Sequence, residues 1–223
     1  MIKYFEQLKN IRVFSNLSDA ELELVISKIK VRHATVEKDT TLFETDDVMQ
    51  EFMVLISGRL QGSRYHYDGD VDLIQIFSLR EIIGLDVVCS ATRKSPLTLS
   101  SLEDSSLIFI DYDSLSSPAL PEELRNTLQD NVIKVLASES IRRLHKIDVL
   151  YRKSLRSRIM VFLRHMQTMT QSDDFHIFMD REQFAQYLGV NRSSLSHELA
   201  KMREEGIIDF HKGHFIMKDE TLL

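Results

Sequence analysis

The sequence of 223 residues contains one cysteine, three prolines, seven glycines and no tryptophan. A single cysteine, Cys89, excludes a disulfide within the chain, and it excludes an iron–sulfur cluster or a cysteine-based zinc site held by one chain. No hydrophobic run is long enough to span a bilayer, and the N-terminal MIKYFEQLKN lacks the apolar region of a signal peptide. We therefore expect a cytoplasmic protein that does not contact a membrane.

Catalytic and metal-binding patterns are also missing. The sequence shows no nucleophile with a paired base, no phosphate-binding glycine loop and no haem-ligating pattern, so we do not expect an enzyme. His211 and His214 form an H-x-x-H pair across a turn, but no third ligand lies nearby in the sequence, and we predict no metal site. Cys89 has two interpretations, a small buried residue or a redox-sensitive thiol.

The acidic residues are unevenly distributed along the chain. The formal net charge is −6, but residues 151–223 hold 11 Lys and Arg against 10 Asp and Glu, and the acidic excess lies in residues 1–150. Residues 151–223 therefore have almost no net charge. If this part of the chain binds a polyanion, one copy neutralises few of its charges, and tight binding would need two linked copies.

Short β-type segments dominate the first half of the chain. A capping box, Ser18 with Glu21, opens a helix, and apolar or alternating runs then continue to about residue 112. These runs are KIKVRHATV, TTLFET, EFMVLISGRLQGSRYHY, VDLIQIFSL, LTLSSL and SSLIFIDY. Many short strands between turns predict a sandwich or a jelly-roll barrel rather than β-α-β units. The expected turns and bends fall at Asp68-Gly69, Gly58 and Gly84.

A long helix is predicted to start at Pro121, because proline and the following glutamates suit a helix N-terminus. At about thirty residues it would be roughly 45 Å long. One stripe follows the spacing of a two-stranded coiled coil: Ile133, Ala137, Ser140, Leu144, Ile147 and Tyr151. A second stripe can pack on the barrel: Leu124, Leu128, Val132, Val135 and Leu136. The alternative is a helix that packs only within its own subunit.

The last third has the pattern of a winged helix-turn-helix. After a helix over LRSRIMVFLRHM, Asp180 with Gln183 forms a capping box for a second helix, which Gly189 ends. Asn191 caps a third helix, whose inward residues recur at helical spacing: Leu195, Leu199 and Met202. Lys212-Gly213 then separates IIDF from HFIM as the turn of a hairpin, which forms the wing.

The outward face of the third helix is polar and cationic, which suits the major groove of DNA. Arginine can donate two hydrogen bonds to guanine, and we assign this role to Arg192. The other candidates for contact with bases are Ser193, Ser196, His197 and the capping residue Asn191. Candidates for phosphate contact are Arg181, Lys201, Lys212 and His214. The alternative is that these side chains only form solvated helix faces.

Taken together, the segments resemble one family, the regulators typified by the cyclic-AMP receptor protein and the fumarate and nitrate reduction regulator. The matching segments are FSNLSDAELELV, TLFETDD, FMVLISGRLQG, the long helix and AQYLGVNRSSLSHELAKMREEGII. The resemblance implies an α+β chain with a jelly-roll (double-stranded β-helix) barrel like that of cyclic-nucleotide-binding domains, a central dimerisation helix and a winged helix-turn-helix. It also implies a homodimeric transcription factor that binds a near-palindromic DNA operator and contacts RNA polymerase.

Two departures in the recognition helix affect the expected operator sequence. Arg192 matches the family's guanine-reading arginine, whereas Ser193 stands where many members have glutamate and His197 where many have arginine. We expect three parts: residues 1–117 as the effector-sensing jelly roll, 118–150 as the dimerisation helix and 151–223 as the DNA-binding domain.

The effector site differs further from the family pattern. Members that bind cyclic AMP carry Gly-Glu and then Arg-Ser-Ala, whereas this chain has Gly84-Leu85-Asp86 and then Arg93-Lys94-Ser95-Pro96. Leu85 cannot accept a hydrogen bond, and Asp86 would point to the other side of a strand. Lys94 or Arg93 can still hold an anion.

On the long helix, Arg143 and Leu144 fall at the positions expected near a purine. We predict a small-molecule effector other than cyclic AMP, such as a small acid or an aromatic compound. The alternative is a barrel without a ligand. For the whole protein, the alternative function is a ligand-binding barrel whose winged helix contacts proteins and does not bind DNA.

Overall fold

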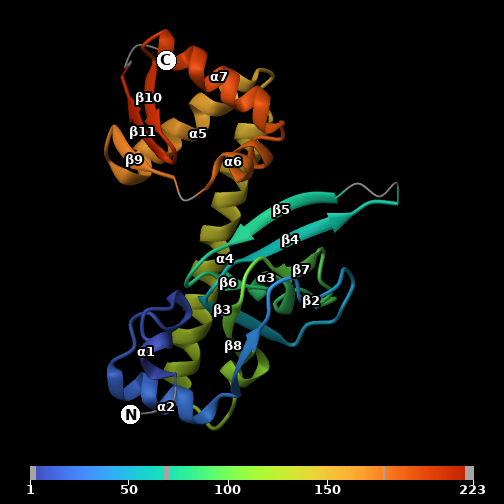
Figure 1. Ribbon diagram of the computed structural model, residues 1–223. Coiled ribbons are helices and arrows are strands. Elements are labelled where there is room, and N and C mark those ends of the chain that lie inside the picture. Colours follow the sequence, from blue (N-terminus) through green and yellow to red (C-terminus); the bar gives the residue numbers. More distant parts are fainter. Residues whose placement is uncertain (1–3, 68–70, 178, 219–223) are drawn as a thin grey trace. The chain divides into compact units, whose positions relative to one another are not determined.

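The computed structural model describes residues 4–67, 71–177 and 179–218 (Figure 1). The chain forms two compact units, Met1–Glu139 and Ser140–Leu223, and the boundary lies within the long helix α4 (Glu122–Leu150). Within the described ranges no helix is both long and apolar enough to cross a membrane.

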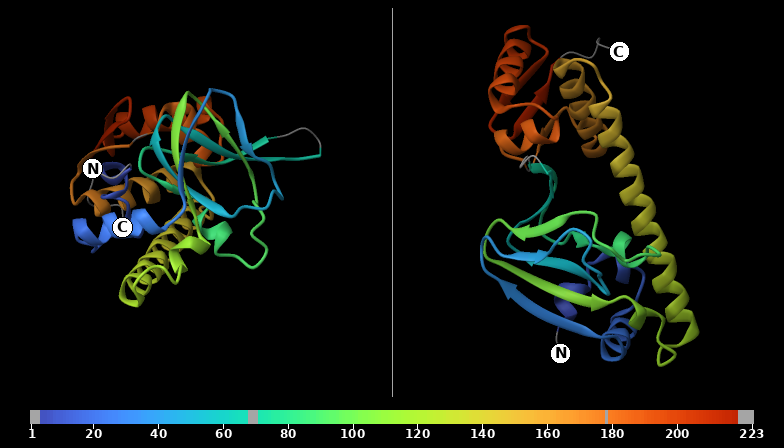
Figure 2. Two further views of the ribbon diagram at one scale, coloured as in Figure 1. Left: turned by 90° about the horizontal axis from the view of Figure 1, so that it is seen from below. Right: turned by 90° about the vertical axis from the view of Figure 1, so that its right-hand side faces the viewer.

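The first unit is built on two four-stranded antiparallel sheets, in the orders β1-β8-β3-β6 and β2-β7-β4-β5. Their strands are β1 (Val31–Val36), β2 (Thr41–Phe43), β3 (Glu51–Ser57), β4 (Leu60–Tyr65), β5 (Val71–Phe77), β6 (Ile82–Ile83), β7 (Thr98–Ser101) and β8 (Ser105–Asp111). The short helices are α1 (Phe5–Leu8), η1 (Arg12–Phe14), α2 (Asp19–Lys28), α3 (Leu85–Val88) and η2 (Asp113–Ser116). The strands curl into a barrel (Figure 2), which confirms the predicted jelly-roll architecture.

The central strands β3 and β8 are apolar and buried on both faces, which explains why they form the centre of the barrel. β3 and β8 pair with Phe52 opposite Ile110 and Val54 opposite Ile108, and all four side chains are buried. Because residues directly opposite each other in a sheet share a face, these pairs fill the barrel interior in layers. The capping box at Ser18 is present and starts α2 as predicted.

Gly58 divides the run EFMVLISGRLQGSRYHY into β3 and β4. Its φ is +91°, and a Cβ at this position would lie 2.7 Å from both the carbonyl oxygen of Asp104 and the Cα of Ser105. Only glycine fits such a close approach of two backbones at positive φ. The predicted bend at Gly58 is therefore confirmed.

We expect Gly58→Ala to lower the free energy of unfolding of the first unit by about 2 to 4 kcal/mol, because backbone strain adds to a steric clash. The matched control is Gly206→Ala in the second unit. Gly206 also has positive φ, +75°, but a Cβ there meets no atom within 4 Å. Only the strain, about 1 to 2 kcal/mol, should remain. Urea denaturation, fitted separately for each unit, measures both values, and equal losses would contradict the steric argument.

The N-terminal half of α4 closes the barrel core, as the second stripe predicted. Its buried residues include Leu124, Leu128, Val132 and Val135. Asn131 is also buried, and its Nδ2 donates to the carbonyl oxygens of Val13 (3.1 Å) and Ser15 (2.7 Å). These bonds satisfy the amide and attach α4 to the N-terminal segment.

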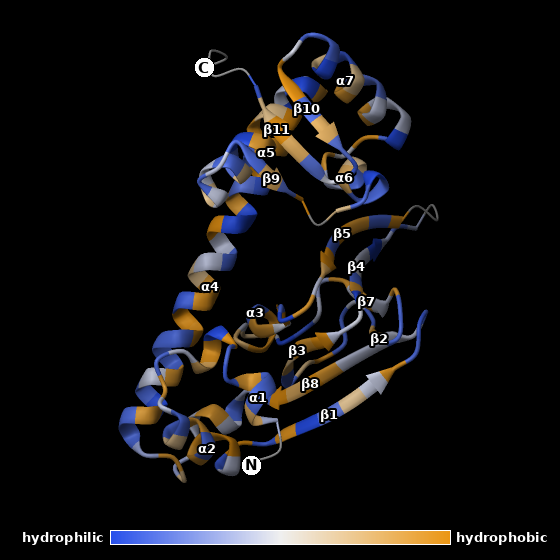
Figure 3. Cartoon of the chain, turned by 60° about the vertical axis from the view of Figure 1, so that its left-hand side comes forward, coloured by the Kyte–Doolittle hydropathy of each residue, from blue (hydrophilic) through white to orange (hydrophobic). Residues whose placement is uncertain are grey.

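Apolar residues occur at intervals along α4 (Figure 3), and those from Ile133 onward include a second set that is exposed. The exposed fractions are 63% for Ile133, 63% for Leu144, 56% for Ile147 and 87% for Tyr151. These are positions of the predicted coiled-coil seam, and Ala137 and Ser140 are also exposed. Ile141, exposed at 57%, adds apolar surface outside the predicted spacing.

The second unit contains α5 (Leu155–Thr170), β9 (Asp174–His176), α6 (Arg181–Tyr187), α7 (Arg192–Glu204), β10 (Ile208–His211) and β11 (His214–Met217). Helices α5, α6 and α7 pack around one core that includes Phe162, Phe184, Leu195 and Phe215. The predicted hairpin is present as β10 and β11. The wing has a third strand, β9, in the order β10-β11-β9. Sequence analysis missed β9, because three residues are too few to show a strand pattern.

One prediction about the first unit was wrong, and another lies outside the described residues. Leu85 and Asp86 belong to the helix α3, so the alternation of a strand does not set the direction of Asp86. The Asp68-Gly69 turn includes undescribed residues, although β4 and β5 pair as antiparallel neighbours on either side of it.

Candidate DNA-binding site

Two side-chain caps and one glycine fix the helix-turn-helix. Asp180 accepts a hydrogen bond from the Gln183 backbone (2.8 Å), and the Gln183 side chain accepts one from the Asp180 backbone (2.9 Å). Gly189 turns the chain with φ of +67°. Asn191 then accepts a hydrogen bond from the Ser194 backbone (2.8 Å) and starts α7. The sequence-predicted boundaries of both helices are confirmed.

α7 presents a polar face that other described residues do not cover. Arg192, Ser193, Ser196 and His197 are all exposed, whereas Leu195 faces the core. The Ser193 hydroxyl donates to the Asn191 side chain (2.8 Å). Within the described part of the chain, the side chains of Arg192, Ser196 and His197 make no hydrogen bond or ion pair. These three side chains are therefore free to contact a ligand.

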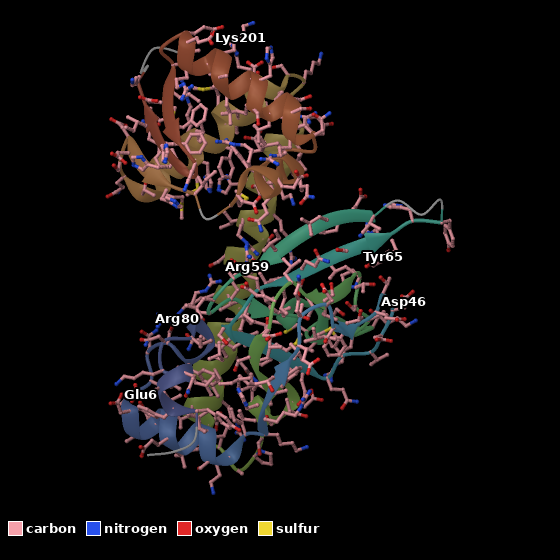
Figure 4. All side chains as sticks on the ribbon, viewed as in Figure 1. Glu6, Asp46, Arg59, Tyr65, Arg80 and Lys201 are labelled. Atoms are coloured by element: carbon pink, nitrogen blue, oxygen red, sulfur yellow. The ribbon has the colours of Figure 1, made fainter. Side chains whose placement is uncertain are left out.

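Basic residues flank this face at both ends. Lys201 is exposed on the C-terminal half of α7 (Figure 4), and Lys212 is exposed at the turn of the wing. Cations at these positions can neutralise DNA phosphates on either side of a groove.

Arg181, a sequence-predicted phosphate contact, has partners within the protein. It is half-buried, its guanidinium lies 5.0 Å from the ring centre of Phe210, and its Nη2 donates to the Lys212 carbonyl oxygen (3.2 Å). Burial, with the nearby charge of Arg192, lowers the pKa of Arg181. Arg181 therefore joins the start of α6 to the wing, a packing role that sequence analysis did not identify.

Three histidines form a row across the wing. Strand pairing places His211 opposite His214 and His214 opposite His176. The His214 Nε2 also contacts the carboxylate of Asp174. Sequence analysis paired only His211 with His214. It missed His176, because this residue lies on β9, the strand that was not predicted. Among the described residues, no group of three or more His, Cys, Asp or Glu is arranged to hold a metal ion.

Two arginines of α5 hold the helix-turn-helix in place, and sequence analysis missed both roles. Arg158 Nη1 donates to the carbonyl oxygen of Leu188 (2.9 Å), at the end of α6, and its Nε donates to that of Arg152 (2.9 Å). Arg156 binds Glu198 and Glu205 of the α7 segment. Neither contact has a local sequence signal, since the partners lie 30 to 49 residues away.

The candidate effector residues of the first unit lie at the start of α3, Gly84 and Leu85, and in the segment before β7, residues 93–95. Gly84 has φ of +78°, a backbone conformation that favours glycine, and the nearest atom that a Cβ there would meet is the flexible end of the Met49 side chain, at 2.5 Å. Leu85 is buried in the barrel core at 3% exposure. Val48 forms a β-bridge with Lys94, whose side chain is exposed.

Arg93 and Ser95 already have partners within the protein. The Arg93 guanidinium donates to both carboxylate oxygens of Asp113, at 2.9 and 2.7 Å. The Ser95 hydroxyl is buried and donates to the Leu97 carbonyl oxygen (2.6 Å). The remaining two candidates, Arg143 and Leu144, lie on the C-terminal half of α4, within the second unit.

Cys89 lies directly after α3 and is partly buried. Burial raises the pKa of its thiol, despite a hydrogen bond with Tyr112 that acts in the opposite direction. The same hydrogen bond and burial raise the pKa of Tyr112 to about 12. Because the thiolate is the nucleophilic form, this environment makes Cys89 less reactive at neutral pH.

These features define a class of protein. A jelly-roll barrel is followed in the chain by a long helix and then by a winged helix-turn-helix whose third helix presents an uncovered cationic face. This combination is that of a DNA-binding transcription regulator with a sensor domain.

Comparison with known proteins agrees with this class. Residues 33–117 match the model of the cyclic nucleotide-binding domain, and residues 157–223 match that of the Crp-like helix-turn-helix domain. The fumarate nitrate reduction regulatory protein of Klebsiella oxytoca is 21% identical over 212 residues, covering 93% of this chain and 82% of the relative. Electron transport regulator A of Shewanella oneidensis is 21% identical over 194 residues, covering 83% and 74%.

Solved structures of the same fold include FixK2 from Bradyrhizobium japonicum, with a TM-score of 0.63, 16% identity and coverage of 85% of this chain and 93% of that one. A CooA mutant from Carboxydothermus hydrogenoformans has a TM-score of 0.63 at 17% identity, covering 98% and 92%. The chain belongs to the family of the cyclic-AMP receptor protein and the fumarate and nitrate reduction regulator. Members of this family are transcription regulators and not enzymes.

Proposed function

We propose that this protein acts as a homodimer that binds a near-palindromic operator, with one α7 helix in each of two successive major grooves. The observation that supports this proposal is the pair of uncovered surfaces: the cationic face of α7 and the apolar stripe of α4. A monomer rarely leaves large apolar side chains exposed in a continuous row. Burial of the α4 stripe in a two-stranded coiled coil would remove this surface from water.

In this proposal Arg192 donates two hydrogen bonds to a guanine. The neighbouring base edges are contacted by Ser193, Ser196 and His197, close to the cap residue Asn191. Lys201, Lys212 and His214 face phosphates. Arg181 supports the wing next to them. Residues 151–223, with 11 Lys and Arg against 10 Asp and Glu, have a net charge near zero, so each subunit gains little affinity from phosphates alone. Linking two such domains raises the affinity by making the second contact intramolecular.

We further propose that a small molecule other than cyclic AMP controls the DNA-competent state. Leu85 offers no acceptor for a ribose hydroxyl, and the Arg93 guanidinium is paired with Asp113. An effector must bind one dimer geometry better than the other, because only a difference in affinity shifts the population. We expect cyclic AMP at millimolar concentration to leave operator affinity unchanged, and a clear gain in affinity would contradict this part.

DNase footprinting on a selected binding sequence tests the dimer model. We expect two protected half-sites with centres about 34 to 36 Å apart, one turn of the duplex. The control is an oligonucleotide with one half-site scrambled, on which protection should weaken strongly at both halves. Equal protection of a single short site, unaffected by the scrambled half, would contradict the proposal.

A further inference from the structure

Arg156 connects one helix to two points on the recognition helix segment. It lies in the first turn of α5, and its Nε donates to the Glu198 carboxylate (2.6 Å). Its Nη1 and Nη2 donate to the two carboxylate oxygens of Glu205, at 2.5 and 3.0 Å. All three guanidinium nitrogens are therefore engaged.

The two acceptors are placed so that they fix α7 in two respects. Glu198 lies in the middle of α7 and Glu205 is its C-cap residue. Seven residues correspond to about two helical turns, so the two carboxylates share one face and lie about 10 Å apart along the axis. Two attachments at this separation restrict both rotation of the helix about its axis and sliding along it.

The ion pairs are partly exposed to solvent. The exposed fractions are 34% for the Arg156 side chain, 21% for Glu198 and 36% for Glu205. Hydrogen bonds from Arg156 lower the pKa of Glu205, and those carboxylates hold the pKa of Arg156 above its usual range. A planar guanidinium that bonds carboxylates through several donors gives geometric specificity that a point charge lacks.

Glu198 directly follows His197 on α7. A carboxylate at that place would repel DNA phosphates if it were left unpaired, so Arg156 has two separable effects. First, Arg156 neutralises the Glu198 carboxylate, and this changes the affinity for every DNA sequence alike. Second, it holds α7 at a fixed rotation, and this changes only the contacts with bases.

We propose that Arg156 is a positioning residue for sequence recognition, which sets the rotation and axial position of α7 through Glu198 and Glu205. This inference rests on the proposed function, in which α7 contacts bases. Arg156 itself does not touch DNA in this proposal.

The double variant Arg156→Gln/Glu198→Gln removes one positive and one negative charge, so it tests positioning at unchanged net charge. We expect its operator affinity to fall by about tenfold or more, the scale of one misplaced base contact. Its affinity for random-sequence DNA and the slope of affinity against salt should stay unchanged, because no net charge is lost. Arg156→Lys, which can reach one carboxylate but lacks the fork, should give an intermediate loss of operator affinity.

The control is Arg152→Gln/Asp148→Asn, which removes an ion pair of 2.6 Å in the same unit that does not involve α7. It should bind operator and random DNA as the parent does. Circular dichroism melts show whether each variant is folded at the assay temperature. If the folded Arg156→Gln/Glu198→Gln variant keeps the parent's ratio of operator to random-DNA affinity, the positioning role is wrong. If the parent itself shows no preference for the operator, the proposed function fails instead.

Discussion

Replacing Arg192 by alanine should strongly reduce the preference of the protein for its operator. The loss of a bidentate contact to guanine costs about 1 to 3 kcal/mol per half-site, and a symmetric dimer loses two such contacts. The expected fall in operator affinity is therefore roughly 30-fold to 10⁴-fold. Arg192 is exposed on α7 and forms no hydrogen bond or ion pair with the described residues, so the substitution should not weaken folding.

Fluorescence anisotropy with operator and random-sequence duplexes measures this effect. Arg192→Lys keeps the charge but not the fork, so it should lose most of the specificity while random-DNA binding is retained. Lys201→Ala is the contrasting variant. As a phosphate contact, Lys201 should contribute equally to both duplexes, and its removal should reduce the salt slope by about 1 per subunit. An Arg192→Ala protein that keeps the parent's ratio of operator to random-DNA affinity would refute the assignment.

The sequence predicted those features of the fold that depend on nearby residues. Capping boxes need partners only three residues apart, and both Ser18 with Glu21 and Asp180 with Gln183 form as expected. Gly58 and Gly189 also mark turns because each has a positive φ that a larger side chain resists. The spacing of buried residues on α4 and α7 was equally informative, since helical periodicity is a local property.

Features that depend on distant partners were missed. Arg156 and Arg158 reach from α5 to residues 30 to 49 positions away, and nothing beside them in the sequence identifies those acceptors. The same reason explains His176, which joins the histidine row only through β9. The alternation expected at Asp86 failed because a single turn of helix, α3, interrupts the barrel there. Such a short helix lacks a periodic signal of its own.

The apolar stripe of α4 leads to the second large effect, a loss of the dimer itself. Leu144 and Ile147 are exposed at 63% and 56%, and the proposed coiled coil would bury them against a second copy. Burying one such side chain is worth about 1.5 to 3 kcal/mol, and twofold symmetry doubles the effect of each substitution. Leu144→Glu should therefore raise the dimer dissociation constant by about 10³-fold, with the charge adding repulsion between the two copies.

Sedimentation equilibrium measures this constant directly, and Ser138→Glu is the matched control. Ser138 is exposed on the same helix. Because each helical residue is rotated by about 100° from the one before it, Ser138 points about 140° away from the mean direction of the seam residues. A glutamate there adds the same charge and should leave the dimer intact. Because two linked domains gain about 10² to 10⁴ in affinity over one, the Leu144→Glu monomer should bind a full operator no better than a half-site. If the parent protein is a monomer with and without operator DNA, the dimer model is wrong. If Leu144→Glu remains dimeric, α4 is not its interface.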